Sequence, residues 1–136
     1  MQLSTAVATA RPIATWVDMD SRGTVLKTKY AWKIEDRVIE VTQYQGRKQD
    51  VGLMGVNGKT SEVFHMGAAS DGTSSQGRWE VDENGDAVLG LAFTSGDDQE
   101  GVLSIRHHPV DEDTMIVTIE LAQPIKFKMI HANPKK

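Results

Sequence analysis

The stretch SIRHHPVDEDTMIVTIEL, residues 104–121, contains the pattern on which the fold prediction depends. In its second half, TMIVTIEL (114–121), one set of alternate positions is wholly apolar, while the other set holds two threonines and a glutamate. Successive side chains of a β-strand point to opposite faces, so this period of two predicts a half-buried strand. The residues before it, PVDED (109–113), are turn formers. The stretch therefore predicts two antiparallel strands joined by a turn.

The same pattern extends outward along the chain. Clusters rich in Gly, Asn and Asp separate short runs rich in Val, Ile, Thr and aromatic residues, and the strongest hairpin signals are Asn57-Gly58, Asp71-Gly72 and Asn84-Gly85. A helix is predicted nowhere except as an alternative to an irregular segment within 1–12, where Pro12 would end it. Strands are predicted at 13–18, 24–33, 37–45, 48–56, 61–68, 74–82, 87–95, 100–108, 113–121 and 124–131.

Short strands joined by tight connections predict an all-β, antiparallel up-and-down arrangement, because no connection is long enough for a parallel crossover. An open sheet of so many strands would curl, and closure removes its exposed edges. We therefore predict a single domain over 1–136, a closed or nearly closed β-barrel of about 8 to 10 strands with little or no helix. A sandwich of two sheets is the alternative.

Composition excludes several classes of function. The chain of 136 residues has a net charge of −4 and no cysteine. The charge gives no reason to expect a nucleic-acid partner, and the lack of cysteine excludes disulfides and Cys-ligated metals. No apolar run approaches the roughly 20 residues of a membrane span, and the first 16 residues make a poor secretory signal. A cytoplasmic protein with no cofactor is predicted.

Several motifs resemble those of the calycin group, which includes the lipocalins and the small bacterial lipocalin-like proteins. They are Trp16 in the first strand, YAW (30–32), GRWEVDENGD (77–86), TMIVTIEL (114–121) and PIKFKMIH (124–131). The Gly-x-Trp of the lipocalin first strand is replaced here by Ala14-Thr15-Trp16. The resemblance implies a barrel with an interior cavity for a small apolar or amphipathic molecule.

The adjacent histidines of the opening stretch suggest a metal or acid/base site, but their spacing argues against a shared one. On a strand, His107 and His108 point to opposite faces and cannot bind the same metal ion. His107 shares the apolar face of Leu103 and Ile105. We therefore predict a polar turn with one inward histidine and no metal. A metal site would need His107 together with His65 or His131.

Residues on apolar strand faces are the candidates for a ligand-binding interior. A one-residue error in register would reverse the face of every residue in a strand, and the aromatic ones are alternatively plain barrel core. The predicted ligand-binding residues are Tyr30, Trp32, His65, Trp79, Phe93, His107 and Phe127.

The leading functional hypothesis is the binding of a small apolar or amphipathic ligand inside the barrel. The first alternative is an enzyme that acts on a small molecule there, with His65 or His107 as the acid/base. The second is an interaction domain that forms a homodimer, because AVLGLAFTS (87–95) is apolar on both faces.

Overall fold

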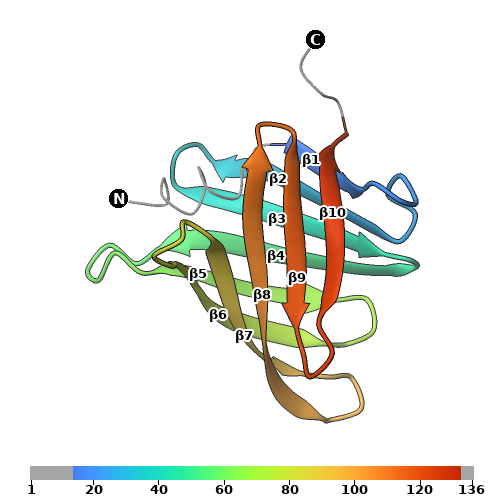
Figure 1. Ribbon diagram of the computed structural model, residues 1–136. Helices are drawn as coiled ribbons and strands as arrows, with labels where there is room; N and C mark the ends of the chain where they lie inside the picture. Colours follow the sequence, from blue (N-terminus) through green and yellow to red (C-terminus); the bar gives the residue numbers. More distant parts are fainter. Residues whose placement is uncertain (1–13, 133–136) are drawn as a thin grey trace.

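A computed structural model of the protein describes residues 14–132, and it is a closed barrel of antiparallel strands (Figure 1). No helix occurs among these residues, so the predicted all-β class is confirmed, and the prediction for 1–12 lies outside the described residues. The strands are β1 (Ala14–Asp18), β2 (Leu26–Ile34), β3 (Val38–Gln45), β4 (Lys48–Val56), β5 (Val63–Ala69), β6 (Ser74–Val81), β7 (Ala87–Thr94), β8 (Glu100–Asp111), β9 (Thr114–Glu120) and β10 (Ile125–His131).

Each strand pairs with its neighbour in the chain, and β1 pairs with β10 to close the barrel. This is the predicted up-and-down topology, and closure excludes the alternative of two sheets. In Figure 1, β8, β9 and β10 run steeply in front, and β2, β3 and β4 cross behind them. The interior lies between these two groups of strands.

All ten predicted strands are present, with boundaries that differ by a few residues. β2 begins at Leu26 and not at residue 24, because Val25 N–H donates to Ser21 Oγ at 2.8 Å and so belongs to the preceding turn. β8 continues to Asp111, three residues past the predicted end. The pairing of β8 with β9 shifts register between Pro109 and Asp111, and such an irregularity is where a strand tolerates proline.

The predicted hairpin turns are held by side-chain hydrogen bonds to nearby backbone N–H groups. Asn57 Oδ1 accepts from Lys59 N at 2.9 Å, and Asp71 Oδ1 accepts from Thr73 N at 3.0 Å. Gly72 and Gly85 have φ of 89° and 85°, the left-handed region that glycine adopts without strain. The turn signals in the sequence therefore mark real turns.

The predicted alternation of inward and outward side chains along the strands is confirmed by their burial. In β9, Met115 and Val117 are 1% and 7% exposed, and they face the interior. The predicted membership of Leu121 in this face is wrong, because β9 ends at Glu120 and Leu121 is 47% exposed. In β5, Val63 and His65 are buried, whereas Met66 is exposed on the outer surface.

The two ends of the barrel differ in their interior packing. We call the end with connections 35–37, 57–62, 82–86 and 112–113 the terminal end, since β1 begins and β10 finishes there. The end with connections 19–25, 46–47, 70–73, 95–99 and 121–124 is the distal end. Fully buried large side chains fill the interior towards the terminal end: Trp16, Ile39, Met54, Met115 and Met129. Polar interior residues on the distal side are Thr28, Gln43, Asp50 and Ser75, whereas His65 and His107 lie nearer the terminal end.

Candidate functional site

A cavity of about 70 Å³ lies in the barrel interior, with walls formed by side chains from β2 to β9. One side of the wall is apolar and includes Leu89, Leu91 and Ile105. The other side is polar and contains titratable groups. A cavity that combines an apolar wall with a few polar groups is typical of small-molecule sites, although those usually measure about 300–1,000 Å³.

The ring of His65 of β5 lies in the wall over Gly52 of β4, which has no side chain. A Cβ atom on Gly52 would lie 2.7 Å from His65 Nε2, so only glycine leaves room for the imidazole ring there. Gly77 is the register partner of His65 on β6, and Trp79 is two residues further along the same inner face. His65 and Trp79 are therefore diagonal cross-strand neighbours, within reach of each other's side chains.

Two nitrogen atoms in this wall have no hydrogen-bond partner within residues 14–132. His65 Nδ1 and Trp79 Nε1 are both buried, in residues that are 7% and 6% exposed. Buried polar atoms are nearly always hydrogen-bonded, to protein or to water. The two residues lie on neighbouring strands and line the same cavity.

His107 of β8 lies against the same indole. Its Nδ1 is 3.2 Å from the carbonyl oxygen of Ala87, which accepts the hydrogen bond, so Nδ1 carries the proton. The rings of His107 and Trp79 are 4.8 Å apart, centroid to centroid. In the neutral ring, His107 Nε2 is then a hydrogen-bond acceptor.

Burial keeps both interior histidines neutral at pH 7. Burial lowers the pKa of His65 to about 4, because the charged ring would lose its hydration. Burial also lowers the pKa of His107 to about 4. The hydrogen bond to Ala87 acts to raise this pKa, and the nearby His65 acts to lower it. The site therefore offers neutral donors and acceptors, and a general base this weak is poorly matched to catalysis at pH 7.

A row of polar residues crosses the distal half of the cavity. Thr28, Gln43 and Asp50 are register partners on β2, β3 and β4, and Thr28 Oγ1 donates to Gln43 Oε1 at 3.4 Å. Burial raises the pKa of Asp50. The positive charge of Lys48 acts to lower this pKa, and the negative charge of Asp71 acts to raise it. Because Asp50 is only half-buried, we expect it to be ionised at pH 7.

Four of the seven predicted ligand-binding residues line the cavity: Tyr30, His65, Trp79 and His107. Trp32 and Phe127 are half-buried and pack against the core outside the cavity. Phe93 lies over Gly101, where an added Cβ would be 2.6 Å from the phenyl Cζ. Ligand binding by any of the seven stays a prediction.

Four further polar residues of the lining were not predicted from the sequence: Thr28, Gln43, Asp50 and Ser75. The signal was present in the period of two, because Thr28 lies between Leu26 and Tyr30 on one face, and Asp50 is four residues before Met54. A polar residue at an inward position is ordinarily assigned to a strand end or an outer face. Only the barrel places these four side chains around one space.

His108, on the opposite face of β8 as predicted, belongs to an outer cluster of charges. Its Nδ1 lies 2.7 Å from Asp86 Oδ1, and Arg106 forms ion pairs with Asp82, Asp86 and Glu120. These contacts fasten the 82–86 turn to β8. Within residues 14–132, no group of three or more His, Asp or Glu side chains is arranged to hold a metal ion.

The part of the chain that the structure describes contains no helix long and apolar enough to cross a membrane. Comparisons of the chain with protein-family models, with curated proteins and with solved structures gave no match.

Proposed function

We propose that the protein binds a small amphipathic molecule in the barrel interior, with an oxygen atom of the ligand between His65 Nδ1 and Trp79 Nε1. The observation that carries this proposal is the pair of buried nitrogen atoms without a partner in the wall of one cavity. Leaving a buried donor or acceptor unsatisfied costs about 1–3 kcal/mol for each group. A ligand group that satisfies both atoms is stabilised by a comparable amount.

The chemistry of the two atoms limits the ligand group. Trp79 Nε1–H can only donate, whereas Nδ1 of a neutral His65 accepts or donates according to its tautomer. A hydroxyl or a carbonyl oxygen satisfies both. Water does so too, and a cavity of about 70 Å³ has room for about two water molecules. A ligand must therefore be small, or place only its polar end here and extend along half-buried Leu91 towards the distal end.

The architecture supports this role, because a closed antiparallel barrel is the form in which calycins hold their ligands. We also propose that the chain itself is a member of the calycin group. The cytoplasmic location and the homodimer stay predictions from the sequence. The enzymatic alternative is disfavoured by the neutral histidines, whose pKa values of about 4 leave them weak bases at pH 7.

A titration with 1-butanol, followed by the indole N–H signals in ¹H–¹⁵N spectra, tests the proposal. The three tryptophans give three signals, and Trp79→Phe identifies that of Trp79. We expect a saturable shift of the Trp79 signal, and about fivefold weaker binding in His65→Phe, since one hydrogen bond of about 1 kcal/mol is lost.

The matched control is His108→Phe, which changes an exposed histidine on the outer face. It should leave the affinity for 1-butanol unchanged. Absence of a saturable shift in the wild-type protein, or equal affinities in His65→Phe and the wild type, would contradict the proposal.

A further inference from the structure

Among the described residues that line the cavity, one side chain is charged, Asp50, and its sign is negative. No lysine or arginine of residues 14–132 lines the cavity, and His65 and His107 are neutral at pH 7. Barrels that hold carboxylate ligands need a cation to offset the ligand's charge, because a charge away from water is costly unless it is paired. This interior has the opposite character.

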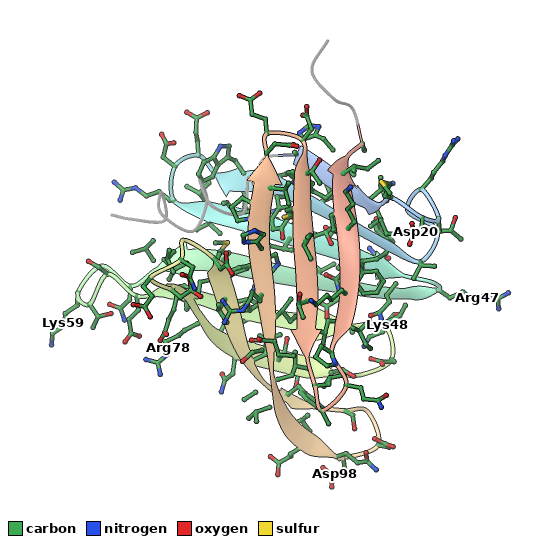
Figure 2. The ribbon with its side chains drawn as sticks, in the orientation of Figure 1. Asp20, Arg47, Lys48, Lys59, Arg78 and Asp98 are labelled. Carbon is green, nitrogen blue, oxygen red and sulfur yellow. The ribbon has the colours of Figure 1, made fainter. Side chains whose placement is uncertain are left out.

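The surroundings of Asp50 leave its carboxylate available to a ligand. Within residues 14–132, no group donates a hydrogen bond to the Asp50 carboxylate, and the side-chain oxygen of its register partner Gln43 accepts from Thr28. Lys48, the cation that acts on the pKa of Asp50, is itself paired with Asp71, whose Oδ2 lies 3.4 Å from Nζ, and both side chains are about half-exposed at the distal end. Figure 2 shows Lys48 beside the β3–β4 connection, at the margin of the barrel. This exposed pair screens Asp50 only partly.

We propose that the interior site selects molecules that carry a protonated amine, and that Asp50 is the residue that binds the ammonium group. This inference rests on the proposed function and specifies its ligand class. The ammonium donates to Asp50, while a buried acceptor such as His65 Nδ1 lies in the same wall. Charge-assisted hydrogen bonds of this kind are stronger than neutral ones, and a carboxylate ligand is repelled by the same group.

The test compares three probes of equal chain length at pH 7: 1-butylamine, 1-butanol and butyrate. Binding is followed by the Trp79 indole signal in the wild-type protein. We expect butylamine to bind about tenfold more tightly than butanol, and butyrate at least about tenfold more weakly, given one charge–charge contact in a partly hydrated site. Added NaCl should weaken the binding of butylamine and leave that of butanol nearly constant.

Asp50→Asn removes the charge and keeps the shape, so it should abolish the preference for butylamine over butanol. The matched control is Asp71→Asn, which removes an exposed carboxylate nearby and outside the cavity. The preference should persist in that variant.

The outcomes separate the two proposals. Butanol binding without a preference for butylamine overturns this inference and leaves the proposed function in place. A preference that survives in Asp50→Asn, or that Asp71→Asn abolishes equally, also overturns it. If none of the three probes binds the wild-type protein, both proposals fail. If Asp50→Asn does not fold, the salt dependence in the wild-type protein still tests the inference. Butylamine binding that NaCl does not weaken would overturn it.

Discussion

Asp18, the last residue of β1, shows how much one buried carboxylate can organise. Its Oδ1 accepts from Leu26 N–H at 2.9 Å and from Ser21 Oγ at 2.7 Å, and its Oδ2 accepts from Ser21 N–H at 2.8 Å. Burial acts to raise the pKa of Asp18, but these hydrogen bonds outweigh it, led by that from Leu26, and the pKa is lowered. Asp18 thus fixes the connection from β1 to β2.

Asp18→Ala should therefore lower the free energy of unfolding by about 2 kcal/mol, because it leaves the N–H of buried Leu26 without an acceptor. Urea denaturation at pH 7 measures the loss. The control is Asp20→Ala, two residues on at an exposed position (labelled in Figure 2), which should change stability by less than about 0.5 kcal/mol. Equal effects of the two substitutions would show that the hydrogen bonds of Asp18 are not what matters.

This role could not be predicted from the sequence. The residue stands in DMDSRG (18–23), a turn-forming cluster in which both aspartates are equally suited to cap the backbone. The partner Leu26 is eight residues away. Which carboxylate is buried depends on how β1 and β2 meet, and that is settled only when the barrel closes around them.

At the scale of the elements, the sequence predicts most of the architecture because the period of two is strong in nearly every strand. TMIVTIEL (114–121) assigns Met115 and Val117 to the interior without any tertiary information. β4 is harder, since its inner face reads Asp50, Gly52 and Met54. A glycine and a carboxylate give no hydrophobic signal, although both positions shape the cavity.

Gly52→Ala tests that reading of β4. The added Cβ would lie 2.7 Å from His65 Nε2 and 3.0 Å from the carbonyl oxygen of Met66, so the imidazole must move. We expect a loss of about 1–3 kcal/mol in the free energy of unfolding and a change in the Trp79 indole signal, since overpacking displaces neighbours.

The matched control is Gly90→Ala on β7, where an added Cβ meets nothing within 4 Å. An alanine in a strand stabilises it by about 0.5–1 kcal/mol relative to glycine. The two substitutions should therefore differ in sign when thermal unfolding is compared. A stabilised Gly52→Ala protein would mean that the ring of His65 is not confined by β4.

For the whole molecule, the closed topology was predictable and the content of the interior was not. Whether a barrel is filled or hollow depends on the total volume of the inward side chains from all its strands. The pattern within one strand does not predict that volume. Tyr30, His65, Trp79 and His107 were placed in the interior by parity alone, and they do line the cavity. Trp32 and Phe127 obey the same parity, yet both are half-buried and neither lines the cavity.

The interior histidines also make the whole protein sensitive to pH. Their pKa values of about 4 in the folded state lie below the ordinary 6.5, so the unfolded chain binds more protons between these values. Stability should fall as the pH drops through this window, by about 2 kcal/mol for each histidine from pH 7 to pH 5.

Denaturation of the wild type at both pH values measures this loss. His65→Asn or His107→Asn should each remove about half of it, while His108→Asn, which alters an exposed side chain, should remove little. A stability that does not change between pH 7 and pH 5 in the wild type would show that the interior histidines are charged or hydrated.

The pairing of β1 with β10 has a consequence for how the chain reaches its folded state. Every other pairing joins neighbours in the chain, whereas this one brings together Trp16 and His131, more than a hundred positions apart. Closing so long a loop has a large entropic penalty, so we expect hairpins to form first and this contact to form late. Until then the first and last strands are open to another molecule of the same nascent protein. β1 has only five residues, so it offers another molecule a short edge for intermolecular pairing during that time.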